Sequence, residues 1–180
     1  MIRLTGGERR GLTLHTPRGR RTRPATARIR QWLFEVLDPP TGLDLLDLFA
    51  GTGAVGIEAL SRGARSALFV EQDEEVVRIL RRNLAKARYE DRSEVWSLPV
   101  EAAVRRLRQA GRRFALVFCD PPYAYRGLEE LLTESVLALL VTEGTLVVEH
   151  RGDHPLLAGG RPPDRVKNFG ETRISVWTVV

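Results

Sequence analysis

The chain has 180 residues, a net charge of +5, 43% hydrophobic residues and 28% charged residues, which excludes a disordered or fibrous protein. No apolar run approaches the ~20 residues of a membrane helix, and the basic start of the chain lacks the apolar stretch of a signal peptide. Cys119 is the single cysteine, so an internal disulfide is excluded and we expect a cytoplasmic protein.

Positive charge is concentrated at the start of the chain. Residues 1–30 hold nine arginines and one acid, Glu8, for a net charge of +8, so the other 150 residues sum to −3. A basic arm on a mildly acidic body is typical of a protein with one surface for nucleic acid, although a solvated tail has the same composition. We therefore expect one domain over 1–180, in which residues 1–25 form a basic N-terminal arm.

The predicted elements begin with a hairpin and a helix. Two alternating runs around glycines predict a small β-hairpin over 3–14. Apolar residues at i, i+3, i+4, i+7 and i+8 predict a helix over 26–37, which two prolines end. Arg28 and Arg30 fall outside the apolar stripe of this helix, so we expect both to face solvent.

From residue 44 onward, strands and helices alternate. Strands are predicted at 44–49, 66–71, 93–98, 113–120 and 144–150, and helices at 54–63, 73–89, 100–110 and 128–140. Segments 165–169 and 172–179 predict a closing hairpin around Gly170. The pattern predicts an α/β fold with a mostly parallel seven-stranded sheet between two layers of helices, ending in an antiparallel hairpin. Such sheets bind ligands beyond the carboxyl ends of their strands.

The stretch LDLFAGTGAVG carries Gly51, Gly53 and Gly56 between a strand and a helix. Glycines let the backbone approach a ligand, and the helix N-terminus offers N–H groups to an anion. This pattern alone suits either the pyrophosphate of NAD or the amino-acid end of S-adenosylmethionine. Asp47, at the strand end, favours S-adenosylmethionine, because a carboxylate attracts an ammonium group and repels a pyrophosphate.

Glu71 ends the next strand, 24 residues after Asp47. A carboxylate at this place can accept hydrogen bonds from both hydroxyls of a ribose, which NAD and S-adenosylmethionine share. The apolar segment after the third strand could wall the adenine. The expected cofactor contacts are Asp47, Phe49, Ala50, Gly51, Gly53, Glu71, Gln72, Pro99 and Val100.

The motif Asp-Pro-Pro-Tyr, Asp120 to Tyr123, follows the apolar run FALVFC. A buried strand gains nothing from ending in a carboxylate, and two prolines stiffen the turn. The Asp120 carboxylate and the Pro121 carbonyl would accept both hydrogens of an exocyclic amine, while Tyr123 stacks on its ring at about 1–3 kcal/mol per base. Holding the hydrogens out of plane frees the nitrogen lone pair to attack a sulfonium methyl group. We predict Asp120, Pro121, Pro122 and Tyr123 as the catalytic residues.

DLFAGTG followed by DPPY resembles the class I S-adenosylmethionine-dependent methyltransferases that modify exocyclic amines. Together with RPATARIRQWLFEVL and KNFGETRIS, these motifs make nearly the whole chain similar to the small bacterial family that methylates N2 of a guanine in 16S ribosomal RNA. The resemblance implies a Rossmann-like class I fold, with Asp47 to Gly53 and Glu71 on the cofactor and Asp120 to Tyr123 on the guanine. Ala27 stands where the helix of that family has an aspartate, so this chain lacks whatever that aspartate does.

The sequence thus predicts methyl transfer from S-adenosylmethionine to a guanine in small-subunit ribosomal RNA, in an assembled or partly assembled particle, by a monomer without a metal. The candidate RNA contacts are Arg9, Arg10, Arg20, Arg21, Arg23, Arg28, Arg30 and Arg126. His150 and His154 have no third ligand nearby, so we expect no metal site. Two alternatives stay open: an amino-methyltransferase of DNA or other RNA, acting on adenine N6 or cytosine N4, and a non-catalytic RNA-binding assembly factor.

Overall fold

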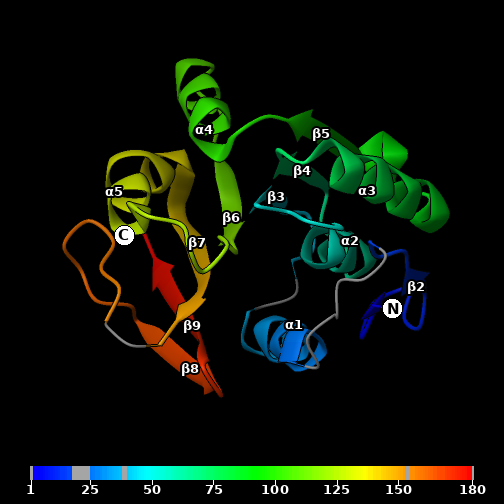
Figure 1. Cartoon of the computed structure of the whole chain (residues 1–180), viewed down its shortest axis with the longest axis horizontal. Helices are drawn as coiled ribbons and strands as arrows, with labels where there is room; N and C mark the ends of the chain where they lie inside the picture. Colours follow the sequence, from blue (N-terminus) through cyan, green and yellow to red (C-terminus); the bar gives the residue numbers. More distant parts are fainter. Residues whose placement is uncertain (1, 18–24, 38–39, 153–154, 180) are drawn as a thin grey trace.

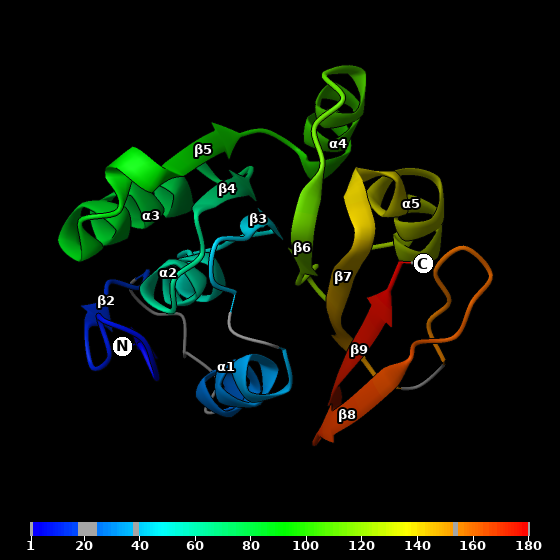
Figure 2. The same ribbon diagram turned by 180° about the vertical axis from the view of Figure 1, so that it is seen from behind.

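The computed structural model describes residues 2–17, 25–37, 40–152 and 155–179. Its central feature is a seven-stranded sheet in the order β5-β4-β3-β6-β7-β9-β8 (Figures 1 and 2). The strands are β3 (Asp44–Leu48), β4 (Ser66–Glu71), β5 (Ser93–Ser97), β6 (Phe114–Cys119), β7 (Leu140–Arg151), β8 (Arg165–Phe169) and β9 (Thr172–Thr178). Strands β3 to β7 run parallel, and β9 is antiparallel to both of its neighbours. The predicted parallel sheet and C-terminal antiparallel hairpin are confirmed.

Helices cover both faces of the sheet. The four long ones are α1 (Ala25–Val36), α2 (Ala54–Ser61), α3 (Glu74–Ala87) and α4 (Val100–Gln109). The first three pack over one face, against Leu45 and Phe69. On the other face, α4 and the helical segment 128–139 pack against Val117 and Val148. The structure therefore has the three layers that the alternating pattern predicts.

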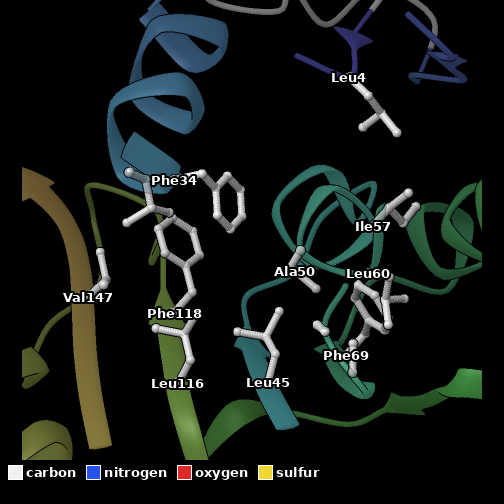
Figure 3. Packing of buried hydrophobic residues seen from close by; sticks show 14 of the residues in the cluster. Leu4, Phe34, Leu45, Ala50, Ile57, Leu60, Phe69, Leu116, Phe118 and Val147 are labelled. Carbon is white, nitrogen blue, oxygen red and sulfur yellow. The ribbon is translucent and has the colours of Figure 1, made fainter. Parts of the chain in front are cut away.

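Alternate residues of β6 belong to different cores. Leu116 and Phe118 face the helices α1 to α3, whereas Val117 and Cys119 face α4. Figure 3 shows Phe34 of α1 pointing toward Phe118. Because side chains alternate along a strand, the residue two places after Phe118 also points to the α1 side of the sheet.

The segment predicted as one helix over 128–140 contains three kinds of helical turn. A short α-helix, α5 (Leu128–Leu131), leads into the π-turn η2 (Leu132–Val136) and the 3₁₀ turn η3 (Leu137–Leu139). The apolar residues Leu131, Leu132, Val136 and Leu139 stay buried throughout. The spacing of apolar residues in the sequence predicts which side of this segment is buried. It does not distinguish the hydrogen-bond patterns of the α-helical, π and 3₁₀ turns.

The start of the chain is packed against the sheet layers. Strands β1 (Ile2–Arg3) and β2 (Thr13–Leu14) pair antiparallel, as the glycine-rich stretch predicts. Asn83 of α3 is fully buried and bonds the main chain of His15, accepting from its N–H at 2.7 Å and donating to its carbonyl at 3.1 Å. Residues 2–15 are therefore anchored, and the alternative of a solvated tail does not apply to them.

Glu58 of α2 links this hairpin to α1. Its buried carboxylate accepts hydrogen bonds from the Thr5 N–H at 3.1 Å, from Arg30 Nε at 3.1 Å and from Arg62 at 2.9 Å. Arg30 is 2% exposed and also donates to the Arg3 carbonyl at 2.8 Å. The prediction that Arg30 faces solvent is therefore wrong. Its charge is matched inside the protein by Glu58, and helical periodicity cannot reveal such a pair.

Candidate active site

The candidate site lies where the direction of the strand order reverses. From β3 the chain continues to β4 and β5 on one side, and β6 and β7 are then added on the other side. The connections that leave β3 and β6 therefore diverge, which opens a crevice at the carboxyl edge. The main chain joins the two strand ends here, because the Asp120 N–H donates to the Leu48 carbonyl at 3.3 Å.

The glycine loop turns sharply from β3 into α2. Phe49, Gly51 and Gly53 have positive φ angles of 58°, 55° and 80°. A Cβ atom would lie 2.2 Å from an α3 side chain at Gly53 and 2.3 Å from a β4 side chain at Gly56, so packing requires glycine at both positions. At Gly51 a Cβ would meet only an ordinary contact at 4.0 Å. Backbone conformation, rather than packing, favours glycine at Gly51.

Asp47 is buried beneath this loop, with 2% of its surface exposed. Its Oδ2 accepts a hydrogen bond from the Gly56 N–H, in the first turn of α2, at 3.0 Å. Phe69 and Phe118 are its register partners on the two neighbouring strands. Burial raises the pKa of Asp47 to about 8, with a smaller contribution from the charge of Glu71 and an opposing one from the Gly56 hydrogen bond. A nearby cation would favour the ionised carboxylate.

Glu71 connects β4 to the glycine loop. Its Oε2 accepts from the Gly51 N–H and its Oε1 from the Asp73 N–H, each at 2.9 Å. Asp73 is the N-cap of α3. Each carboxylate oxygen can accept a second hydrogen bond. Two hydroxyl groups could therefore bind Glu71 without breaking its main-chain contacts.

The remaining predicted cofactor residues follow β4 and β5. Gln72, directly after β4, and Pro99, after β5, are both exposed, and Pro99 precedes the first turn of α4. Val100 is 4% exposed and packs in the core beneath α4. The amphipathic helix directs this side chain into the core, and a contact of Val100 with an adenine stays a prediction.

A cavity of about 190 Å³ joins the glycine loop to the Asp-Pro-Pro-Tyr motif. The predicted site residues that line it are Arg30, Asp47, Phe49, Ala50, Gly51 and Asp120. Glu149, which was not predicted, also lines it. Sequence reasoning missed Glu149, although an acid after the apolar run LVV at a strand end carries the same signal as Asp120.

The motif itself forms a corner at the end of β6. Pro121 is buried, and Pro122 accepts a hydrogen bond on its carbonyl from the Tyr125 N–H at 2.8 Å. Tyr123 is 37% exposed, and its hydroxyl lies 2.8 Å from the Thr172 hydroxyl. The Tyr123 ring lies 5.7 Å from the guanidinium carbon of Arg151. The ring is thus held beside β7 and β9, and its stacking on a base stays a prediction.

Tyr125 links the corner to the glycine loop. Its ring meets the Phe49 ring edge-on, with centroids 5.1 Å apart and planes at 71°. Its hydroxyl donates to Glu101 at 2.5 Å. Burial raises the pKa of Tyr125, and the hydrogen bond to Glu101 raises it further, so the phenol stays protonated. The edge-on contact between the Tyr125 and Phe49 rings supports Phe49 in its left-handed backbone conformation next to the cavity.

Comparison with known proteins identifies the family. A family model described as conserved hypothetical protein 95 matches residues 2–178. The chain belongs to this family. The ribosomal RNA small subunit methyltransferase D of Escherichia coli (strain K12) is 40% identical over 132 residues, which are 73% of this chain and 65% of the E. coli protein.

Solved structures share the fold of this family member. The hypothetical protein TTHA0928 of Thermus thermophilus superposes with a TM-score of 0.85 at 34% identity, over 99% of this chain and 100% of that one. An RNA methyltransferase of Salinibacter ruber, solved with S-adenosyl-L-homocysteine, has a TM-score of 0.67 at 20% identity, over 87% of this chain and 93% of that one. The class I fold and the resemblance to small-subunit rRNA methyltransferases are thus confirmed.

The predicted RNA contacts of this family member differ in exposure. Those on the surface are Arg10, Arg28 and Arg126, and those outside the described residues are Arg20, Arg21 and Arg23. Arg9 is half-buried, with its guanidinium carbon 5.9 Å from the Tyr89 ring. Arg30 is held in a buried ion pair with Glu58 and lines the cavity instead of the outer surface, so its contact with RNA stays a prediction.

Within the described ranges, no group of three His, Cys, Asp or Glu side chains is placed to hold a metal ion. His150 is buried, and its ring nitrogens each lie 2.8 Å from an oxygen, the Arg151 carbonyl and the Ser175 hydroxyl. Burial lowers the pKa of His150. His154 lies outside the described part of the chain. None of the described helices has the length and apolarity to cross a bilayer.

Proposed function

We propose that this protein transfers a methyl group from S-adenosylmethionine to the exocyclic N2 amine of a guanine in small-subunit ribosomal RNA. One observation carries the proposal: Asp47, Gly51 and Asp120 line a single cavity at the point where the strand order reverses. The name of the E. coli relative supports the substrate class. The proposal includes a cytoplasmic monomer whose single domain spans 1–180.

The carboxyl edge offers a row of positions that fit the parts of the cofactor. Pro99 follows β5, Glu71 ends β4, and Asp47 with Gly51 belongs to the end of β3, so their order in space follows β5-β4-β3. These positions would hold the adenine, the ribose hydroxyls and the amino-acid end, in that order. When bound, S-adenosylmethionine supplies a methyl carbon that forms a C–N bond as its C–S bond breaks and sulfur keeps the electron pair.

The acceptor amine would bind at the next strand end, after β6. Asp120 accepts one N2–H, and the main-chain carbonyl of Pro121 accepts the other. This grip orients the nitrogen lone pair toward β3, and positioning of this kind can lower a barrier by roughly 7–11 kcal/mol. The methylated nitrogen then releases one proton to Asp120 or to water. Tyr123 would cover the face of the base.

The target guanine has to leave its stack to reach a cavity at a sheet edge. The exposed arginines Arg10, Arg28 and Arg126 would neutralise phosphates beside that nucleotide. In the sequence, the basic arm contributes three further arginines, Arg20, Arg21 and Arg23. Binding of this kind depends steeply on salt concentration.

The test uses small-subunit particles from cells that lack this protein. The purified protein is incubated with methyl-labelled S-adenosylmethionine and these particles, free rRNA or duplex DNA, and the labelled nucleoside is identified by mass spectrometry. N2-methylguanosine in rRNA is expected, and Asp120→Ala is the inactive control. A methylated adenine or cytosine would replace the proposal by one of the alternatives. Binding of particles without any methyl transfer would favour a non-catalytic assembly factor.

A further inference from the structure

Glu149 lies on the acceptor side of the cavity. It is 6% exposed, lines the cavity and stands near the end of β7. Cys119, the last residue of β6, pairs with Val148 of β7, so Asp120 and Glu149 come directly after this pair on the two chain segments. Adjacent strands lie roughly 4.8 Å apart, and successive side chains point to opposite faces. Both acids therefore point to the same side, over the row that Phe118 occupies.

The charges around the cavity favour a ligand that donates hydrogen bonds. Three carboxyl groups line it, from Asp47, Asp120 and Glu149, together with one guanidinium group, from Arg30. The Arg30 guanidinium also forms an ion pair with Glu58, a residue that does not line the cavity. Each carboxylate oxygen can accept more than one hydrogen bond, so Asp120 and Glu149 can accept N–H groups of a ligand in addition to their contacts within the protein.

We propose that Glu149 selects guanine by accepting a hydrogen bond from its ring N1–H, beside the N2 amine held by Asp120. This inference rests on the proposed function. Guanine presents the N1–H and N2–H donors side by side, so two adjacent carboxylates match it. Adenine and cytosine present a ring nitrogen acceptor beside their amine, and its lone pair would face the Glu149 carboxylate. The pair of acids thus distinguishes guanine from the other bases that carry an exocyclic amine.

The test replaces the target guanine of a minimal rRNA substrate with 2-aminopurine. This base keeps the amine at C2 but carries a lone pair instead of a hydrogen at N1. Wild-type protein should methylate the guanine substrate with a kcat/KM at least about 100-fold higher than the 2-aminopurine substrate. With 2-aminopurine the hydrogen bond from N1–H to the Glu149 carboxylate is lost, and the lone pair of N1 faces the carboxylate instead. The Glu149→Gln variant can donate from its amide to the bare N1, so the preference for guanine should fall below about tenfold.

Two controls separate recognition from folding. Glu143→Gln changes an exposed acid of the same strand and should keep the wild-type preference. Calorimetry with S-adenosylmethionine should give the same affinity for Glu149→Gln and for wild type. If the Glu149→Gln variant methylates neither the guanine RNA nor the 2-aminopurine RNA, the ratio of its affinities for the two RNAs is measured instead. The fluorescence of 2-aminopurine then reports entry of that base into the cavity.

The outcomes distinguish this inference from the proposed function. If wild-type protein methylates guanine and 2-aminopurine equally well, Glu149 does not read N1–H, while the proposed function stands. An unchanged preference in Glu149→Gln, in turnover or in binding, overturns the inference in the same way. Loss of cofactor affinity with an unchanged base preference would place Glu149 on the cofactor instead. No methylation of any guanine substrate by wild type would overturn the proposed function itself.

Discussion

The Asp47 carboxylate accepts a hydrogen bond from the Gly56 N–H at 3.0 Å, across the loop that both residues flank. The bond ties the end of β3 to the first turn of α2, where the helix dipole favours a negative charge. It requires glycine at position 56, since a Cβ there would lie 3.1 Å from Asp47 Oδ2 and closer still to Phe69. A buried acid thus holds the loop in shape while remaining part of the cavity wall.

Cofactor binding should release a proton at neutral pH. Burial raises the pKa of Asp47 to about 8, so the free protein holds this carboxyl group mostly protonated at pH 7, whereas an ammonium ligand favours the ionised form. Calorimetry at pH 7 in two buffers with different ionisation enthalpies measures the released protons. The Asp47→Asn variant should release fewer, and equal release by both proteins would show that Asp47 does not meet the ammonium group.

The same pKa predicts how stability changes with pH. In the unfolded chain Asp47 ionises near 3.8, whereas in the folded protein it keeps its proton up to about 8. The folded state therefore binds more protons between these values, and the contribution of Asp47 to the free energy of unfolding falls as pH rises through this window. Urea titrations at pH 5 and pH 8 should show a smaller decline for Asp47→Asn than for wild type.

Substitution of Asp120 should separate catalysis from cofactor binding. Asp120→Ala removes an acceptor of the amine hydrogens, and we expect kcat to fall by at least about 100-fold with little change in cofactor affinity. Asp120→Asn keeps an oxygen that can accept, so it should retain more activity than Asp120→Ala. Single-turnover methylation and calorimetry measure the two effects. A variant that loses the cofactor instead would assign Asp120 to cofactor binding.

Arg28 and Arg30 lie two residues apart on α1, and their substitution by methionine should change the stability of the protein to very different extents. Arg30→Met leaves the buried Glu58 without one of its cations, which should lower the free energy of unfolding by about 3–5 kcal/mol. Arg28→Met changes an exposed residue and should alter it by less than about 0.5 kcal/mol. Urea denaturation measures both. Equal stability of the two variants would contradict the structural role of Arg30.

The salt dependence of RNA binding should identify the arginines that meet phosphates. Arg10→Gln, Arg28→Gln and Arg126→Gln should each reduce the slope of log K against log salt by roughly 0.7 to 0.9 for every phosphate that the variant no longer neutralises. Arg113→Gln is the matched control, since Arg113 is exposed next to the amino end of β6, at the opposite edge of the sheet. If Arg113→Gln changed the slope as much as the three other variants, the slope would depend on the net charge of the protein and would not identify the arginines that contact phosphates.

The ring of Tyr123 should matter more than its hydroxyl. Tyr123→Phe removes the contact with Thr172 but keeps the aromatic face, so the KM for RNA should change by less than about threefold. Tyr123→Ala removes stacking, worth about 1–3 kcal/mol, and should raise the KM about 5- to 150-fold. Steady-state kinetics compares the two variants. A large effect of Tyr123→Phe alone would indicate that the Thr172 contact positions the corner.

Local patterns were enough to predict the core of each strand of the large sheet, the four long helices and the motif at the end of β6, although β7 begins at Leu140 and not at the predicted residue 144. The segment 66–71 agrees with β4 at both ends, because six consecutive residues between turn signals leave little choice of register. Asp47, Gly51 and Asp120 were recognised for a related reason. A carboxylate or a glycine interrupts an apolar run at a strand end, and such an interruption has no role in packing.

Contacts between distant segments had to be seen in three dimensions. The order β5-β4-β3-β6-β7-β9-β8 places Asp120 and Glu149 side by side, although the neighbouring strands are joined by a helical segment of the chain. Arg30 was expected on the surface because periodicity registers only apolar side chains, and its partner Glu58 lies on another helix. The periodicity of a sequence predicts which side of a helix or strand is buried. Whether two charged side chains form an ion pair depends on the distance between them, which is set only when the helices and strands pack together.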